Sequence, residues 1–492
     1  MYCQTQSRVK IPSTNSFTEY FPFELGTCQG CNLSPTLFNI YINDLPYCLS
    51  KIQNNPIMIG ETQVSCLMYA DDIVLHSTSE KGLQASLNCL EEFCNKWRME
   101  INLNKTKSLT FNSRKISPAL TLNGQPVENV NSYCYLGFTL TKSGSFHAAK
   151  EGLARKGAKA FFGINQCTKN ISARTTLKLF DSIIKPIILY CSEIWGLSEL
   201  SNTHCNPLFK MLTRQDTPYE KLQTRVCKQT LGLNRNSCNI PSKTELGRIP
   251  LGNSIISNII KFWIHVMHSN ENSLLYKTYI FQNTNVSSNS YSLWSKIQII
   301  AKHCKLNKEE IPPENWTQEQ TSKFICKTKS ATQNIYAQFA NDYLKNTDQN
   351  TGKLNIYRQI KNNIIFESYL DKVKNCDHRK ALTRLRLSAH NLPIERGRHL
   401  GIPREQRFCT LCKTTAIGDE VHLLANCNHP SVTITRHKFR EKIQAISPQT
   451  SLLNNKQLAL YILSAADAST QAISAKYCHD ILNIVSQQSK SM

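Results

Sequence analysis

The sequence predicts an α+β fold: a small antiparallel sheet with helices over residues 1–145, a mostly helical remainder, and a small zinc-binding segment near the C-terminus. Three observations indicate this arrangement. Short apolar runs of strand length, some alternating with polar residues, are separated by turn residues before residue 145. Apolar residues at helical spacing predominate after it. Four Cys and His residues between positions 409 and 427 have the spacing of a metal site.

Composition indicates a large basic protein. The 492 residues are enough for roughly two to four domains with a sizeable core. The 58 Lys and Arg against 35 Asp and Glu give a net charge of +23. This excess suits a polyanionic partner such as RNA or DNA, because phosphates attract cations whatever the base sequence. A basic protein that binds no nucleic acid would have the same composition.

The 20 cysteines do not indicate a secreted disulfide framework, because no basic segment with an apolar signal core opens the sequence. The longest apolar stretch, residues 183–194, is interrupted by Lys185, Pro186 and Glu193 and is too short to cross a bilayer. We therefore expect an intracellular protein, nuclear or cytoplasmic or both, with mostly reduced thiols and no membrane partner.

The first predicted elements are a β-ribbon and a helix. Alternation at residues 8–11 and 17–23 predicts the ribbon. Gly26 and Gly30 bracket a loop, after which Ser34 is expected to cap a helix with Pro35 in its first position. Apolar residues at helical spacing predict one inward face, namely Leu37, Phe38, Ile40, Tyr41 and Leu45.

Residues 64–76 predict a strand, a tight turn and a second strand, with Asp71 and Asp72 at the bend. Two hard oxygen donors on a β-scaffold suit Mg²⁺, which takes its remaining ligands from water and phosphates. Ordinary turn chemistry also accounts for two Asp residues at a bend, because Asp favours turns and is readily solvated there.

Three further elements complete this region. Residues 82–98 predict an amphipathic helix that packs the core. Residues 101–111 predict a strand that carries Lys105 and Lys107. Residues 135–138 have a Gly that lets backbone approach a neighbour closely.

Four motifs occur in order within about 110 residues. They read QGCNLSPTLFNIYINDL from Gln29, YADD from Tyr69, INLNKTK from Ile101 and YLGF from Tyr135. In this order and wording the set resembles the later palm motifs of reverse transcriptases from non-long-terminal-repeat, LINE-type retrotransposons. The resemblance implies part of a right-hand polymerase palm that copies RNA into DNA, with an RNA template, a DNA primer or target and nucleoside triphosphates as partners.

The resemblance also implies roles for individual residues. Asp71 and Asp72 would be catalytic ligands of Mg²⁺ or Mn²⁺. Lys105 would approach the leaving pyrophosphate as a charge neutraliser or general acid, although a solvated strand face is the alternative for one Lys. Template and nucleotide contacts would come from Gln29, Gly30, Tyr69, Leu136 and Gly137.

The sequence departs from the family pattern in one respect. The family uses a third carboxylate on an upstream strand, whereas Glu19 and Glu24 are the only acids before Gly26 and neither has that context. We therefore expect an N-terminally truncated frame that lacks the upstream fingers and the first catalytic strand, and that is catalytically incomplete. The alternatives are a non-catalytic RNA- or DNA-binding remnant, and a remnant that is not expressed or does not fold.

The rest of the sequence, from residue 146 on, predicts helices. Residues 146–166 carry a basic helix that resembles the thumb of these polymerases, and residues 177–195 a second, more buried helix. Residues 283–292 are rich in Asn and Ser and predict a linker, and residues 293–377 look helical and suggest no function. The expected divisions are a partial palm, the thumb and connector, a linker with a helical region, a basic zinc segment and closing helices, at 1–145, 146–280, 281–380, 381–440 and 441–492.

The zinc prediction depends on Cys409, Cys412, His422 and Cys427, in a Cys-x2-Cys-x9-His-x4-Cys pattern. Thiolates and imidazole at such spacing close a tetrahedron around Zn²⁺. Unrelated core cysteines beside a His are the alternative, and His429 is a substitute for Cys427 as the fourth ligand. The pattern resembles the C-terminal cysteine-histidine motif of LINE-type polymerases.

We expect zinc to supply folding energy to a segment with too little core of its own. Arginines before and within this segment would present cations to a nucleic-acid backbone; they are Arg384, Arg386, Arg396, Arg398, Arg404 and Arg407.

Overall fold

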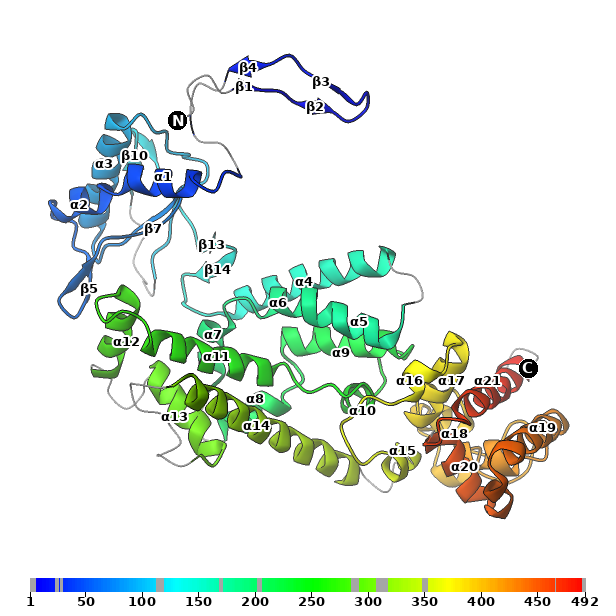
Figure 1. The fold of residues 1–492 in the computed structure, drawn as a ribbon. Coiled ribbons are helices and arrows are strands. Elements are labelled where there is room, and N and C mark those ends of the chain that lie inside the picture. Colours follow the sequence, from blue (N-terminus) through cyan, green and yellow to red (C-terminus); the bar gives the residue numbers. More distant parts are fainter. Residues whose placement is uncertain are drawn as a thin grey trace. The chain divides into compact units, whose positions relative to one another are not determined.

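The computed structural model describes residues 6–22, 26, 30–111, 119–167, 171–200, 206–284, 292–306, 317–346, 353–464 and 466–488. The chain forms two compact units, residues 1–145 and 146–492. The first unit mixes short strand pairs with helices, and the described part of the second is built from helices (Figure 1). This mixed architecture confirms the predicted α+β class at the level of secondary structure. In the described residues, no helix is both long enough and apolar enough to span a bilayer.

The N-terminal ribbon is formed as predicted. The strands β1 (Gln6–Ser7) and β4 (Phe21–Pro22) pair antiparallel, as do β2 (Lys10–Ile11) and β3 (Ser16–Phe17). The guanidinium of Arg8 lies 4.1 Å from the ring centre of Phe17 and 5.0 Å from that of Tyr20. Such cation–π contacts stabilise a ribbon that has little buried surface of its own.

The helix after the glycine loop differs from its prediction. Helix α1 (Ser34–Ile42) begins at Ser34, and Leu33 before it already has helical angles (φ −86°, ψ −27°). Ser34 is therefore inside the first turn and is not the cap, which needs an extended backbone. The predicted inward face is also wrong, because Leu37, Ile40 and Tyr41 are exposed.

Helices α2 (Leu45–Ser50) and α3 (Glu80–Lys96) form the core of the first unit. The hydroxyl of Ser79 accepts the N–H of Gly82 and caps α3. As predicted, the apolar stripe of α3 is buried, with its centre at Leu87, Leu90, Phe93 and Cys94. This helix supports the strand pairs that carry the predicted site.

The other strands of the first unit are short. They are β5 (Ile57–Ile59) with β6 (Thr62–Val64), β7 (Cys66–Tyr69) with β8 (Asp72–Leu75), β10 (Thr121–Leu122) with β11 (Gln125–Pro126), and β13 (Ser132–Tyr135) with β14 (Phe138–Thr141), all antiparallel. The predicted strand 101–111 is reduced to β9 (Lys107–Ser108), which pairs parallel with β12 (Glu128–Asn129). Asn102 accepts the N–H of Lys105, and this turn interrupts the extended chain.

The second unit opens with α4 (His147–Cys167), which confirms the helix predicted at 146–166. The prediction of a single helix over residues 177–195 is wrong. The segment is divided into α5 (Ala173–Leu179), a π-helical turn (Phe180–Ile184), α6 (Lys185–Ile188) and α7 (Ser192–Trp195). Cys191 has φ +55°, and this left-handed residue separates the last two segments.

Helices continue through the middle of the second unit. They are α8 (Pro207–Thr213), α9 (Pro218–Thr230), α10 (Asn239–Glu245), α11 (Gly252–Met267), α12 (Leu274–Thr284), α13 (Leu293–His303) and α14 (Gln318–Asn346). The predicted linker falls between α12 and α13, and its residues 285–291 lie outside the described part of the chain.

The C-terminal helices share one hydrophobic core. They are α15 (Asn355–Ile360), α16 (Tyr369–Lys372), α17 (Cys376–Arg386), α18 (Pro393–His399), α19 (Pro430–Ile446), α20 (Asn455–Ser464) and α21 (Gln471–Gln488). The same core includes Cys409, Leu411, Leu424 and Cys427. Long-range packing therefore gives the Cys/His segment a core that it shares with these helices, and the contribution of zinc to its folding stays a prediction.

A group of mostly buried polar and charged side chains, here called the charge centre, links these helices; it consists of Arg386, Glu245, Glu367 and Tyr369. The Nε of Arg386 lies 2.6 Å from Glu245 Oε1, and its Nη2 lies 3.2 Å from Glu367 Oε2. The hydroxyl of Tyr369 donates to Glu245 at 2.7 Å, and Arg386 also donates to the carbonyl of Ser464 at 2.9 Å. Burial tends to raise the pKa of Glu245, but the adjacent Arg386 lowers it below its usual value.

We expect Arg386→Met to lower the free energy of unfolding of the second unit by about 3–5 kcal/mol, because Glu245 would remain charged and buried without its partner. Urea denaturation followed by tryptophan fluorescence measures the change. Arg396→Met is the matched control, since Arg396 is exposed and its loss should cost less than about 0.5 kcal/mol. Equal effects of the two substitutions would contradict the role of the charge centre.

Candidate active site and metal centre

The hairpin of β7 and β8 carries the two adjacent aspartates. Tyr69 pairs with Asp72, so Ala70 and Asp71 form a two-residue turn. Ala70 has φ +52°, as one position of such a tight turn requires. Both carboxylates are exposed, while Met68 and Ile73 pack against the core of α2 and α3. The hairpin therefore holds two charged carboxylates at its tip and buries its apolar side.

A second hairpin, β13 and β14, has the same design. Tyr135 pairs with Phe138, and the turn residues Leu136 and Gly137 have φ +46° and +78°. Positive φ at both positions is the pattern of a type I′ turn. Burial and the Asp72 carboxylate, in that order, raise the pKa of the Tyr135 phenol. The carboxylate of Asp72 thus acts on the phenol of Tyr135 in the second hairpin.

The remaining predicted residues of the first unit are dispersed. Lys105 is exposed in the turn before β9, and its carbonyl accepts the hydroxyl of Tyr133 at 3.1 Å. Tyr69 is 66% exposed beside the aspartates. Gly30 has φ +83°, a backbone conformation that favours glycine. Gln29 lies outside the described residues.

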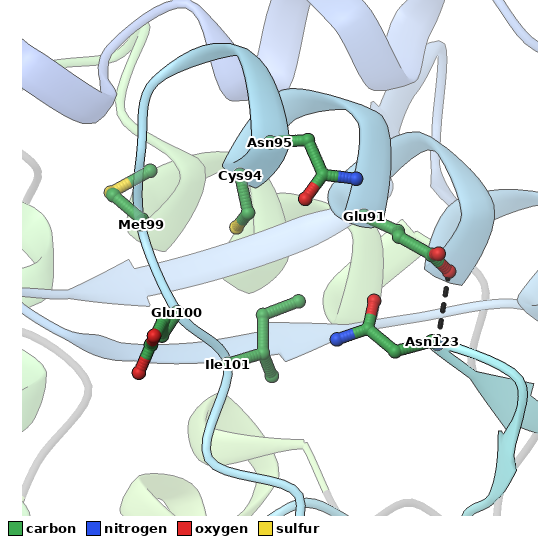
Figure 2. Close-up of a pocket in the computed structure, with 7 residues that line it drawn as sticks. All are labelled: Glu91, Cys94, Asn95, Met99, Glu100, Ile101 and Asn123. Atoms are coloured by element: carbon green, nitrogen blue, oxygen red, sulfur yellow. Dashed lines mark hydrogen bonds between the residues drawn. The ribbon is translucent and has the colours of Figure 1, made fainter.

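A cavity of about 250 Å³ opens beside the C-terminal end of α3 (Figure 2). It is lined by Glu91, Cys94, Asn95, Met99, Glu100, Ile101 and Asn123. Glu91 accepts the backbone N–H of Asn123 at 3.0 Å, so this carboxylate already has a structural partner. None of the residues predicted to bind nucleotide or metal lines this cavity.

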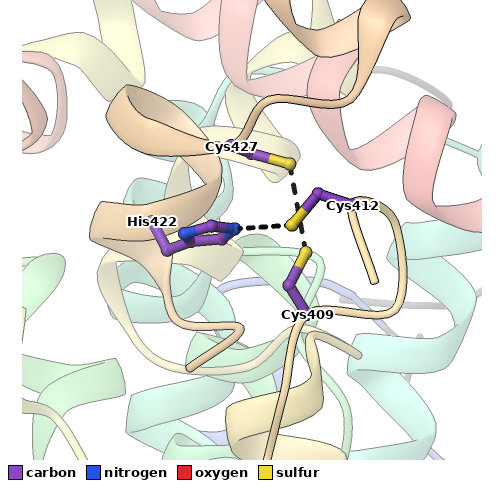
Figure 3. Close-up of side chains that lie close together, drawn as sticks. All are labelled: Cys409, Cys412, His422 and Cys427. Carbon is purple, nitrogen blue, oxygen red and sulfur yellow. Dashed lines mark hydrogen bonds between the residues drawn. The ribbon is translucent and has the colours of Figure 1, made fainter. Parts of the chain in front are cut away.

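The second candidate site is the cluster of Cys409, Cys412, His422 and Cys427, in which one ligand atom from each residue lies within 4.8 Å of the others (Figure 3). Cys409 Sγ lies 3.9 Å from Cys427 Sγ, and Cys412 Sγ lies 3.4 Å from His422 Nε2. Within the described residues, no other group of three or more Cys, His, Asp or Glu side chains could hold a metal ion in this way. Three sulfurs and one imidazole nitrogen suit Zn²⁺.

Local backbone structure positions the four side chains. The bridge between Phe408 and Ile417 closes the loop that carries the first two cysteines. His422 begins a π-helical turn that ends at Asn426, and Cys427 follows it with an extended backbone. Hydrogen bonds from Cys427 and His422 lower the pKa of the Cys409 thiol well below its usual range, against the effect of burial. The cluster is therefore predisposed to hold a thiolate, the form that binds metal.

His429, the alternative fourth ligand, is not part of the cluster. Its Nε2 lies 3.1 Å from the side-chain nitrogen of Gln488. The geometry therefore brings Cys427 to the fourth position.

Two acidic residues of this region were not predicted from the sequence. Asp419 accepts the backbone N–H of His422 at 2.8 Å and so fixes the start of its turn. Glu420 is buried, and its Oε1 lies 2.9 Å from His390 Nε2. The Asp three residues before His422 is a helix-cap signal that could have been found, whereas the His390 contact depends on the fold.

One of the arginines around the cluster differs from its prediction. Arg386 is fully buried in the charge centre, so it presents no cation to a ligand. Arg398 pairs with Glu395 at 2.5 Å. Arg407 donates to the carbonyls of Ile394 and Ile402, Arg384 to that of Gly232, and Arg404 is half-buried. Arg384 and Arg396 are exposed, so the prediction is wrong for Arg386 and stays a prediction for the other arginines.

Comparison with known proteins finds similarity that includes most of the first unit. Residues 3–140 match the family model described as reverse transcriptase (RNA-dependent DNA polymerase). An RNA-directed DNA polymerase from the mobile element jockey of Drosophila funebris is 28% identical over 195 residues, which are 38% of this chain and 20% of the relative. A probable RNA-directed DNA polymerase from transposon BS of Drosophila melanogaster is 27% identical over 210 residues, 40% of this chain and 22% of the relative.

A Pol polyprotein from the type-1 retrotransposable element R2 of Popillia japonica is 29% identical over 128 residues, 24% of this chain and 21% of the relative. Residues 3–140 are thus similar to reverse transcriptases, and these relatives are named as products of mobile elements. The chain spans about a fifth of the length of the jockey and BS relatives.

The residues that match the reverse transcriptase model contain both hairpins, with Asp71, Asp72 and the Leu136–Gly137 turn. The Cys/His cluster lies outside them, in the second unit. The similarity to reverse transcriptases therefore supports an assignment for the two hairpins only. The assignment of the metal cluster rests on the geometry of its four side chains.

We expect the purified chain to hold about one zinc ion and to lose it in Cys412→Ser and Cys427→Ser, because three sulfurs and one nitrogen complete a tetrahedron. Metal content measured by inductively coupled plasma mass spectrometry tests this. Cys326→Ser and His429→Ala are the controls: Cys326 is an exposed thiol and neither residue belongs to the cluster. Zinc retained in Cys427→Ser but lost in His429→Ala would reverse the assignment of the fourth ligand.

Proposed function

We propose that this chain is the distal part of a non-LTR retrotransposon reverse transcriptase, and that Asp71 and Asp72 are ligands of its catalytic metal. One observation carries the proposal: within the matched residues, two adjacent exposed carboxylates occupy the tip of a tight hairpin. When bound, Mg²⁺ or Mn²⁺ lowers the pKa of a primer hydroxyl and neutralises the charge that develops on the phosphates. In the intact family the reaction is RNA-templated DNA synthesis.

The other residues of the hairpins have binding roles in this proposal. Gly137 has no side chain to cover the backbone of the Leu136–Gly137 turn. This suits close contact between the turn and a primer end. Tyr69 presents an exposed ring beside the aspartates, and Gln29 and Gly30 are proposed to contact the template or nucleotide. Lys105 is exposed and is proposed to neutralise the leaving pyrophosphate.

The proposal divides the chain as the sequence predicts. Residues 1–145 are a partial palm, 146–280 a thumb and helical connector, 281–380 a linker and helical region, 381–440 a basic segment with a zinc knuckle and 441–492 closing helices. Its partners are an RNA template and a DNA primer or target, and its location is nuclear or cytoplasmic. Zinc would join the Cys409–Cys412 loop to the His422–Cys427 turn within the common core, and so stabilise both.

A second candidate function is nucleic-acid binding without catalysis. Two-metal phosphoryl transfer needs carboxylates that bridge two ions. Around Asp71 and Asp72, the described residues provide no third acid close enough to share an ion. The net charge of +23 still favours binding of a polyanion. We infer that the chain by itself binds primed RNA and does not extend the primer.

Primer extension on an RNA template with Mg²⁺ tests this inference. We expect salt-dependent binding and no incorporation by the wild-type chain, and the same result for Asp71→Ala/Asp72→Ala. Incorporation that disappears in the double variant would contradict the incomplete site and would support catalysis by this chain. Absence of any binding to primed RNA would contradict the proposed function as a whole.

A further inference from the structure

The N-terminal ribbon, formed by β1 to β4 (Figure 1), has two faces with different chemistry. Lys10 lies opposite Phe17 in the pairing of β2 with β3, and Ser7 lies opposite Phe21 in that of β1 with β4. Opposite residues share a face, and side chains alternate between the faces along a strand. Lys10 and Phe17 therefore lie on one face, and Ser7, Val9 and Phe21 lie on the other.

One face carries two cations and two aromatic rings, from Arg8, Lys10, Phe17 and Tyr20, and we call it the aromatic–basic face. The guanidinium of Arg8 lies 4.1 Å from the ring centre of Phe17 and 5.0 Å from that of Tyr20. These contacts place Arg8 and Tyr20 on the same face as Phe17. Phe17 and Tyr20 are 48% and 59% exposed, so the contact with Arg8 leaves much of each ring open to a partner.

The described part of the chain leaves this face uncovered. Apart from Ser7, which is half-buried, every residue from 6 to 22 is exposed. A two-stranded ribbon without a core is only marginally stable in water. Packing in the described structure therefore does not account for the aromatic side chains. Clustered exposed apolar groups of this kind mark an interaction surface.

The charges and rings of the face together define the partner that it fits. Arg8 and Lys10 attract an anion, and Glu19 is the one acidic residue between positions 6 and 22. Aromatic rings and guanidinium planes are surfaces on which unpaired bases stack. A single strand supplies both phosphates and free base faces, whereas the bases of a duplex stack on one another. An acidic peptide would satisfy only the two cations.

We propose that the aromatic–basic face binds single-stranded RNA, with bases stacked on Phe17 and Tyr20 and phosphates at Arg8 and Lys10. The inference rests on the proposed function, which gives the chain an RNA template, and it adds a surface outside the two hairpins of the candidate active site. Every base has a π-face, so this surface holds RNA without reading its sequence.

Two double variants of the full chain separate the rings from the charges. Phe17→Leu/Tyr20→Leu, the ring variant, removes both rings and keeps the charge. Arg8→Gln/Lys10→Gln, the cation variant, removes both charges and keeps the rings. Binding is measured by fluorescence anisotropy with a labelled single-stranded RNA 20-mer over a range of salt concentrations.

Each variant has a matched control. Val9→Ala/Phe21→Leu changes two exposed side chains on the opposite face of the same ribbon and removes one ring. Lys345→Gln/Lys456→Gln removes two exposed lysines of α14 and α20 and matches the cation variant in net charge. For both controls we expect clearly smaller changes in affinity and salt slope than for the variants they match.

For the ring variant we expect a dissociation constant raised about tenfold, because stacking on aromatic side chains contributes at least that factor. Its salt slope should equal that of wild type, since stacking releases no counterions. For the cation variant we expect a salt slope reduced by about 1.4, because each lost phosphate contact on a single strand lowers the slope by about 0.7. Binding to a 20-bp RNA duplex should be the same for wild type and the ring variant.

A ring variant that binds single-stranded RNA as wild type does, or no more weakly than its ribbon control, would overturn the face and leave the proposed function intact. A ring variant that also shows the reduced slope of the cation variant would mean that the rings hold the ribbon together, and would overturn stacking. Equal weakening on duplex RNA would overturn it as well.

Two further probes test the identity of the partner. If the ring variant weakens binding of single-stranded DNA of the same sequence but not of RNA, the RNA assignment is wrong. If polyglutamate binds wild type more tightly than the cation variant while RNA binds both equally, the partner is an acidic protein and the RNA assignment is again wrong. A wild-type chain that binds no RNA would overturn both this inference and the proposed function.

Discussion

Two adjacent carboxylates must stay in contact with water or a cation, and this constraint organises the first unit. The chain meets it with a two-residue turn that leaves Asp71 and Asp72 exposed while the flanking strands bury one side against α2 and α3. A slip of one residue in the pairing of Tyr69 with Asp72 would turn the charged group toward that core. The core behind the hairpin, with α3 as its main element, is therefore what fixes the geometry of the candidate active site.

The second unit depends on a different electrostatic arrangement. Arg386 and Glu245 are both fully buried and satisfy each other across α17 and α10. Around them, one hydrophobic core extends to Cys409 and Cys427, so the metal cluster is embedded in a helical unit. A buried ion pair of this kind contributes little net stability when intact but is costly to break. It thus specifies which helices meet.

Sequence reasoning predicted features whose signals are local. The hairpin of β7 and β8, the apolar stripe of α3 and the grouping of Cys409 with Cys412 follow from spacing over a few residues. It failed where the partner of a residue is distant in the sequence. Arg386 was predicted to present its charge to a ligand, because its partner Glu245 lies 141 residues away. The helix expected over 177–195 instead contains a π-helical turn directly before Lys185 and Pro186, and it ends before Cys191, which has a left-handed conformation. Pro186 is a local signal for such an irregularity, whereas the conformation of Cys191 has no clear signal in the sequence.

The most direct test of the central claim is metal occupancy at the Asp71–Asp72 turn, independent of any polymerase activity. Fe²⁺ supplied in place of Mg²⁺, with ascorbate and peroxide, cleaves backbone near the place where it binds, and mass spectrometry locates the cut. We expect cleavage centred on the turn between β7 and β8 in the wild-type chain, and its loss in Asp71→Asn/Asp72→Asn. Cleavage centred elsewhere, or unchanged in the double variant, would contradict it.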